Sequence, residues 1–195
     1  MTEIDVNILE RARAGDRQAH TALYRAFAPM VYTLACRMLG SRSLAEDVLQ
    51  DSFVEVLRKA DQFRGDAGIG GWIKRIAINK CLSQLRSPWA KRRSALPEAD
   101  AFDAVLPIGG APDRRAEVDA GLEHAFMALG PIARAVVWLH DAEGYTHEEI
   151  AALMGRSTSF SKSQLARAHR QLRDISATAS KERETEPCLG TLKTV

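Results

Sequence analysis

Side chains that could read DNA gather between positions 144 and 173 of this chain. Thr146 can cap a helix, and Glu149, three residues later, completes a capping box. Gly155 can adopt the left-handed conformation that ends a helix, and Ser157 is a good cap for the next helix. From position 156 to position 173 there are five Arg and Lys residues and no acidic residue. A short capped helix followed by a basic helix suits insertion into a major groove, although a helical hairpin with a solvated basic face is the alternative.

A second segment that could bind nucleic acid follows the glycine-rich loop at 65–71. Lys74 and Arg75 can neutralise phosphates. Trp72 can stack on an unpaired base, and Asn79 could bond to the edge of a base swung out of a duplex. The glycines do not form a nucleotide-phosphate loop, because the sequence has neither GxGxxG nor GxxxxGK[ST]. Trp72 could instead fill the hydrophobic core at the start of a helix. It could also do both, with one face of its ring packed in the core and the other stacked on a base.

Carboxylates dominate one face of the helix that we expect at 43–60. Asp47, Gln50, Asp51 and Val54 share the face opposite its apolar stripe. Paired carboxylates can perform acid–base catalysis, but that chemistry needs a pocket in which their pKa values diverge, and an exposed row offers none. The row is therefore either a solvated face or a docking surface for a basic partner. An exposed valine among the carboxylates favours docking.

The elements that must position these side chains are all helical. Almost every periodic segment has helical spacing, and no run alternates long enough for a convincing strand. The expected helices span 4–14, 17–39, 43–60, 70–87, 116–129, 131–142, 146–154 and 158–174. Matching apolar stripes on the second, third and fourth of these can close one small core. The sequence thus predicts an all-α fold of two small helical domains joined by a flexible linker, with a helix-turn-helix in the second domain.

Proline and glycine mark the domain boundaries. They interrupt the helical pattern after position 87, which predicts domains at 1–87 and 116–176 with a flexible linker at 88–115. Beyond Ala177 the chain is short of apolar residues, so we expect a disordered tail at 177–195.

The composition excludes several classes of protein. The net charge of +2 hides strong segregation, because residues 64–93 hold eight Lys and Arg residues and one acidic residue. The three cysteines are far apart and without metal-ligand spacing, which argues against a zinc site and a disulfide framework. No signal peptide or membrane-spanning run is visible, so we expect a cytoplasmic protein without membrane insertion.

Taken together, these motifs resemble bacterial RNA polymerase sigma factors of the extracytoplasmic function (ECF) group. The resemblance rests on four features in the family's order. Residues 45–53 are similar to the helix that binds the polymerase clamp, and residues 63–65, 71–79 and 85–86 are similar to the promoter-melting and minus-ten segment. Residues 129–134 and 143–155 are similar to the start of the minus-thirty-five domain, and residues 162–168 are similar to its recognition helix. One departure is Ser159–Gln164, where the family usually has Gly-Thr-Val-Lys-Ser-Arg. The loss of an arginine and the gain of Phe160 leave the promoter sequence that is read open, but they do not affect the expected binding mode.

The resemblance implies a role for particular side chains. Those that would bind core RNA polymerase are Asp47, Gln50, Asp51 and Phe53. Those that would open and hold the melted non-template strand of the minus-ten element are Arg64, Trp72, Lys74, Arg75, Asn79 and Lys80. Those that would grip the minus-thirty-five duplex of promoter DNA are Arg156, Ser157, Thr158, Lys162, Ser163, Gln164 and Arg167. The resemblance also implies an anti-sigma factor as a partner, and no catalytic residue, metal or cofactor.

Two other classes of function can be set against a sigma factor. A repressor or activator would use only the second domain and would leave the acidic helix and the Trp72 loop without a role. A hydrolase would use Asp47 and Asp51, but the sequence shows no nucleophile–base pairing and its histidines are scattered. Stoichiometric co-purification with core polymerase would separate the first class from a sigma factor.

Overall fold

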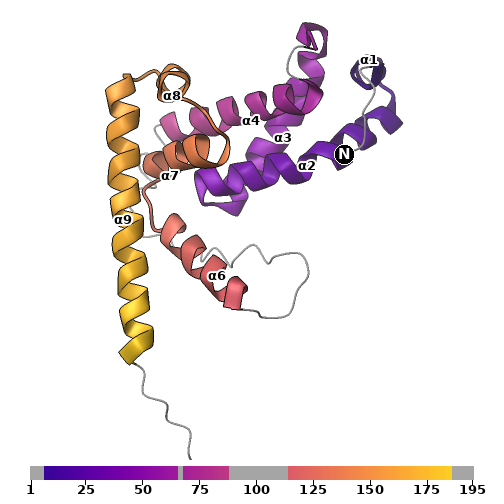
Figure 1. Cartoon of the computed structure of the whole chain (residues 1–195). Helices are drawn as coiled ribbons and strands as arrows, with labels where there is room; N and C mark the ends of the chain where they lie inside the picture. Colours follow the sequence, from indigo (N-terminus) through magenta and orange to yellow (C-terminus); the bar gives the residue numbers. More distant parts are fainter. Residues whose placement is uncertain (1–6, 66–67, 88–113, 186–195) are drawn as a thin grey trace, which may run out of the picture.

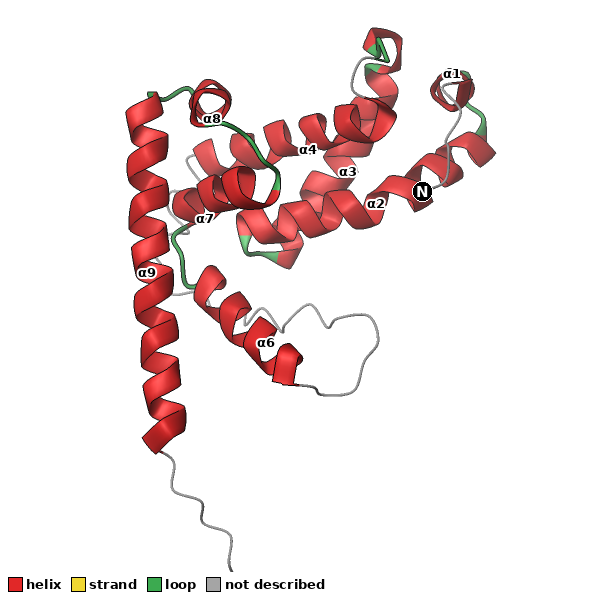
Figure 2. Cartoon of the chain, viewed as in Figure 1, coloured by secondary structure: helices red, strands yellow, loops and turns green. Residues whose placement is uncertain are grey.

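Helices account for every regular element that the structure, a computed structural model, describes in residues 7–65, 68–87 and 114–185 (Figures 1 and 2). They are α1 (Asn7–Arg13), α2 (Arg17–Leu39), α3 (Arg42–Arg58), a 3₁₀ turn (Ala60–Gln62), α4 (Gly68–Arg86), α6 (Arg114–Met127), α7 (Pro131–Val137), a π-helical turn (Trp138–Ala142), α8 (His147–Met154) and α9 (Thr158–Thr185). The expected all-α fold is confirmed. Within the described ranges, no helix is both long and apolar enough to cross a bilayer.

The first helical unit is built on α2, α3 and α4, which pack against one another. Its fully buried side chains come from all three helices and include Val31, Leu34, Met38, Val48, Val56, Ile73, Ile78 and Leu82. Asp16 caps α2 by accepting hydrogen bonds from the backbone N–H groups of Gln18 and Ala19, at 2.8 and 3.3 Å. Gly40 ends α2 in the left-handed conformation, with φ at 66°, and the chain turns directly into α3.

Cys36 and Cys81 are small core residues of this unit. Burial raises the pKa of both thiols, that of Cys81 to about 12. Both thiols therefore remain protonated near neutral pH and are poor metal ligands or nucleophiles.

The second helical unit holds the helix-turn-helix, and its caps are the ones that the sequence predicts. Thr146 Oγ1 accepts from the Glu149 N–H at 3.2 Å, and Glu149 Oε2 accepts from the Thr146 N–H at 2.8 Å. Gly155 ends α8 with φ at 63°. Ser157 Oγ then accepts from the Phe160 N–H at 3.2 Å and caps α9. Three hydrogen bonds and one left-handed glycine thus define where the two helices of the motif begin and end.

The capping box gives a direct test of this local geometry. Thr146→Ala removes the side-chain acceptor of the Glu149 N–H in the first turn of α8, so we expect the free energy of unfolding to fall by about 1 kcal/mol. Thermal unfolding followed by circular dichroism measures the loss as a lower Tm. Thr21→Ala is the matched control, because Thr21 is exposed within α2 and only bonds back to the Arg17 carbonyl. Equal losses in both variants would contradict a capping role.

Two boundary predictions need correction. Helix α9 continues to Thr185, so residues 177–185 are helical and not part of a disordered tail. The segment is poor in apolar residues but rich in Ala, Lys, Glu and Arg, which favour helix without needing to pack. Helix α6 begins at Arg114, two residues inside the expected linker. The rest of that linker, 88–113, and the last ten residues, 186–195, lie outside the described residues.

The two helical units pack against each other. Helix α7 contacts α2, and α8 contacts α4 (Figure 1). The buried side chains of both units, from Leu9 to Ala168, form one continuous apolar cluster. The sequence predicts two separate domains and gives no sign of this contact.

Candidate nucleic-acid and docking surfaces

The acidic face of α3 consists of Glu46, Asp47, Gln50, Asp51 and Val54, and all five are exposed. The side chain of Val54 is 66% exposed, although it is apolar. Within the described residues, no ion pair engages Asp47 or Asp51. Their charges therefore face solvent uncompensated, as a docking surface for a basic partner requires.

Two residues that border the acidic face, Phe53 and Glu55, have packing or ion-pair partners that the sequence does not reveal. Phe53 is half-buried, and its ring lies 5.0 Å from that of Tyr24, so it borders the face and also packs the core. Glu55 bonds to Arg58 at 2.7 Å and Lys59 at 2.8 Å. These bonds, that of Arg58 foremost, hold the pKa of Glu55 at about 2. Because cations surround its carboxylate, Glu55 adds little to the acidic face.

Helix α4 carries an exposed stripe, which we call the α4 stripe: Trp72, Arg75, Asn79 and Arg86. Spacings of three, four and seven residues bring these side chains to one side of the helix. Arg75, Asn79 and Arg86 are exposed, and Trp72 is half-buried. The ring of Trp72 lies 5.4 Å from that of Phe63 and packs against the core. Core packing and stacking on a base are thus compatible roles for Trp72, since part of its ring is buried against the core and part is accessible.

The other three residues expected at the minus-ten element lie outside this stripe, and two of them have ion-pair partners. Arg64 is exposed in the loop before α4. Lys80 Nζ lies 4.0 Å from Glu55 Oε2 on α3. Lys74 Nζ lies 2.7 Å from Glu143 Oε2, which belongs to the second helical unit. Lysine in the sequence signals only a positive charge, so this ion pair could not be foreseen.

The start of α9 presents a basic surface. Lys162, Ser163 and Arg167 are exposed on one side of the helix, and Arg156 and Ser157 are exposed in the turn before it. Thr158 and Gln164 are half-buried on the same helix. Exposed cations at the start of the second helix of a helix-turn-helix are placed to meet phosphates and base edges of a major groove.

Two side chains position this surface and were not recognised in the sequence. Ser161 is fully buried, and its Oγ lies 3.0 Å from His147 Nδ1, which ties α9 to α8. Phe160 is half-buried beneath Arg156, whose Cζ lies 5.7 Å from the ring centre. In the sequence these two residues are only a serine and a phenylalanine at helical spacing from the apolar face. That pattern is too weak to predict a positioning role from one sequence.

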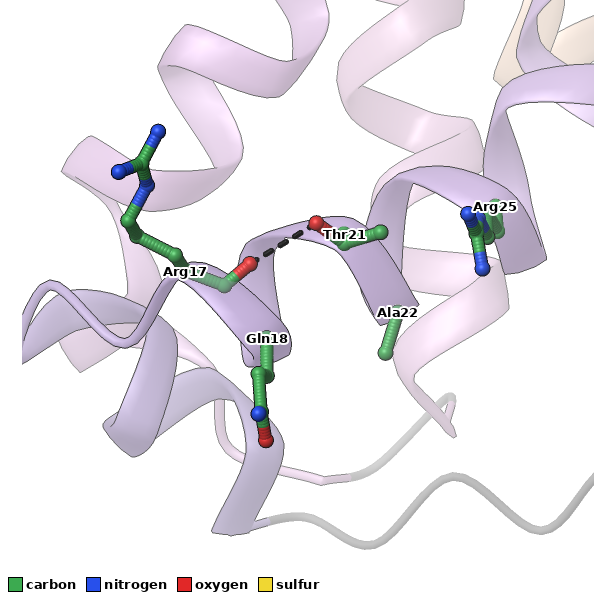
Figure 3. A pocket seen from close by; sticks show the side chains of 5 residues that line it. All are labelled: Arg17, Gln18, Thr21, Ala22 and Arg25. Atoms are coloured by element: carbon green, nitrogen blue, oxygen red, sulfur yellow. Dashed lines mark hydrogen bonds between the residues drawn. The ribbon is translucent and has the colours of Figure 1, made fainter.

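A shallow hollow lies on the first half of α2 (Figure 3). Its lining residues are Arg17, Gln18, Thr21, Ala22 and Arg25. Two arginines and two neutral polar side chains offer no acid–base pair. The part of the chain that the structure describes also holds no group of three or more His, Cys, Asp or Glu side chains that could bind a metal ion.

Comparison with known proteins points to one family. Residues 23–91 match the Sigma-70 region 2 family, and residues 120–172 match the Sigma-70, region 4 family. The ECF RNA polymerase sigma factor SigM of Mycobacterium tuberculosis is 34% identical over 170 residues, covering 86% of this chain and 82% of that protein. The RNA polymerase sigma factor CarQ of Myxococcus xanthus is 31% identical over 171 residues, covering 86% of this chain and 94% of that protein. The fold is similar to that of the Bartonella quintana sigma factor RpoE, solved in complex with the anti-sigma factor NepR, with a TM-score of 0.53, 22% identity and coverage of 80% and 94%.

Proposed function

This chain belongs to the ECF group of RNA polymerase sigma factors, and we propose which of its surfaces engages each partner. As an alternative sigma factor, it directs core RNA polymerase to specific promoters and initiates transcription. It does so as a non-enzymatic subunit that binds core polymerase and promoter DNA. We assign polymerase binding and the minus-ten element to residues 1–87, and the minus-thirty-five element to residues 116–176.

The acidic face of α3 docks on the polymerase. Asp47 and Asp51 supply charge, Gln50 supplies hydrogen bonds, and Phe53 supplies an apolar edge. The observation that supports this assignment is that both aspartates are exposed beside an exposed valine. Opposite charge on the partner accelerates encounter and selects one orientation.

The α4 stripe holds the melted non-template strand of the minus-ten element. Arg75, together with Arg64, Lys74 and Lys80 around it, neutralises backbone phosphates, which sets affinity without reading sequence. The accessible side of Trp72 stacks on an unpaired base, and Asn79 bonds to a base edge. Opening of the duplex is favoured because these contacts exist only with unpaired bases.

The start of α9 enters the major groove of the minus-thirty-five duplex. Lys162 and Arg167 approach phosphates or base edges from the exposed side of the helix. Ser163 and Gln164 offer further hydrogen bonds, with Arg156, Ser157 and Thr158 at the backbone beside the helix start. Ser157 already caps α9 with its hydroxyl, so its contribution to DNA binding comes from its position at the helix N-terminus.

We assign an anti-sigma factor as the regulator of this chain and the cytoplasm as its location. The solved relative of similar fold was crystallised with an anti-sigma factor. This location follows from the proposed function, because polymerase and promoter DNA meet in the bacterial cytoplasm.

Transcription in vitro tests the proposed surfaces together. Core polymerase is incubated with the full chain and a library of genomic promoter fragments, and the RNA products are sequenced. We expect discrete start sites that core polymerase alone does not give. A chain that binds promoter fragments without joining core polymerase would instead be a repressor or activator, and the polymerase-binding assignment would be wrong.

A further inference from the structure

Asp141 lies in the π-helical turn between α7 and α8, and its carboxylate is bonded to two histidines. His140 Nδ1 lies 2.7 Å from Asp141 Oδ1, and His169 Nε2 of α9 lies 2.7 Å from Asp141 Oδ2. Partial burial raises the pKa of Asp141, but the hydrogen bonds from His169 and His140 outweigh it and hold this pKa below its ordinary value. The carboxylate is therefore ionised near neutral pH and can only accept, so both ring nitrogens that face it carry a hydrogen.

A second tether joins the same turn to the start of α9 by way of α8. The ring of His140 stacks on that of His147, with ring centres 4.7 Å apart and planes 24° apart. His147 Nδ1 lies 3.0 Å from Oγ of Ser161, which is fully buried in α9. Asp141 is thus connected to α9 at two points, Ser161 and His169, which lie about two helical turns apart.

The two points of attachment enclose the part of α9 that we assign to the minus-thirty-five element. The enclosed residues of the proposed DNA surface are Lys162, Ser163, Gln164 and Arg167. Between the two points, Leu165 and Ala168 are buried against the rest of the unit. Apolar contact of this kind is non-directional, whereas hydrogen bonds have preferred distances and angles. The two tethers therefore determine the direction in which the enclosed segment points.

Direction matters more for reading a base sequence than for attraction to DNA. Hydrogen bonds to base edges weaken steeply when donor and acceptor are misaligned. Contacts with phosphates depend mainly on charge and carry no sequence information directly. A loss of alignment in α9 should consequently reduce the preference for one sequence over another more than it reduces binding to any duplex.

We propose that Asp141 is a positioning residue for promoter recognition, which holds residues 162–167 in the direction that the minus-thirty-five duplex requires. It acts through His169 at one end of this segment and through His140, His147 and Ser161 at the other. The proposal rests on the function proposed above for the start of α9. It predicts that removing the carboxylate weakens sequence-specific binding. Charge alone predicts the opposite, because a lost negative charge beside a DNA-binding helix strengthens its attraction to phosphates.

Binding of promoter fragments by the polymerase holoenzyme tests this prediction. Core polymerase carrying the full chain is titrated with a promoter fragment found in the transcription assay above, and with the same fragment after its minus-thirty-five element is scrambled. The ratio of the two affinities measures sequence reading. We expect Asp141→Ala to lower this ratio roughly tenfold, because two hydrogen bonds to a charged acceptor are lost. Affinity for the scrambled fragment should stay the same or rise.

Glu148→Ala is the matched control for the change of charge. It removes the same charge from an exposed position of α8, in the same helix-turn-helix. Among the described residues, no hydrogen bond or ion pair joins Glu148 to α9. We expect this variant to keep the wild-type ratio. Equal ratios in Asp141→Ala and Glu148→Ala overturn the proposal.

Two substitutions of His169 separate the hydrogen bond from general packing. Glutamine carries an amide N–H₂ group close to the position of the histidine Nε2, so His169→Gln can keep the bond to Asp141, whereas His169→Ala cannot. We expect His169→Ala to lower the affinity ratio and His169→Gln to restore most of it. Both variants lose the imidazole ring, so an equal loss in both assigns the effect to packing and overturns the proposal.

Hydrogen exchange of the free full-length chain, followed by mass spectrometry, measures the hold on α9 without polymerase or DNA. We expect residues 158–170 to exchange faster in Asp141→Ala and His169→Ala than in the wild type, with α2, α3 and α4 unchanged. Unchanged exchange in α9 overturns the proposal. If the wild-type holoenzyme does not distinguish the two promoter fragments, the minus-thirty-five assignment is wrong, and the exchange rates alone decide whether Asp141 holds α9.

Discussion

Reversing the charge of both exposed aspartates, Asp47→Lys with Asp51→Lys, should lower the affinity for core RNA polymerase by roughly a thousandfold or more. Like charges brought together in an interface cost several kcal/mol, and about 1.4 kcal/mol corresponds to a factor of ten in affinity. The fold should not change, because both side chains are exposed on α3 and the core lies on its other side. Fluorescence anisotropy of the labelled chain titrated with core polymerase measures the affinity, and circular dichroism checks the helix content.

A matched control separates docking from long-range attraction. Glu10→Lys with Asp61→Lys changes the net charge by the same amount at two exposed positions outside the acidic face. We expect this variant to bind within a few-fold of the wild type at physiological salt, since screening weakens distant charges. Equal losses in both variants would mean that overall charge drives binding, and wild-type binding by the aspartate variant would remove the docking assignment.

Local interactions were predicted from the sequence because their partners lie within one turn of helix. Thr146 and Glu149 are three residues apart, and both halves of their capping box form as expected. Gly155 takes the left-handed conformation because it ends α8, where a glycine has no Cβ to oppose that conformation. The exposure of Asp47 and Asp51 followed in the same way, because helical periodicity places them opposite the apolar stripe of α3.

Long-range contacts could not be predicted, because the same residue type serves several purposes. The Arg134 side chain finds a carbonyl partner 95 residues away, at Leu39. The one available signal was a charge within the apolar run at 132–139, which indicates a buried charge but not its partners. Lys74 shows the same limit: a lysine that pairs with Glu143 and a lysine that binds phosphate look alike in a sequence.

Trp72→Ala should impair opening of the promoter more than initial binding to duplex DNA. Stacking of a base on an aromatic side chain contributes about 1–3 kcal/mol, so the population of open complex should fall by roughly 5- to 150-fold. Duplex binding should change little, because we assign it to the basic surface of α9 and to phosphate contacts. Permanganate footprinting of unpaired thymines measures opening, and a mobility-shift assay with the polymerase holoenzyme measures duplex binding.

Because Trp72 also packs against Phe63 and the core, its structural contribution has to be separated from stacking. Trp72→Phe keeps an aromatic ring and most of the packing, and it should restore a large part of the opening lost in Trp72→Ala. Thermal unfolding of both variants reports the packing contribution independently. If opening is intact in Trp72→Ala, the ring is only a core residue; if opening and duplex binding fall together with Tm, the loss is structural and the stacking assignment is wrong.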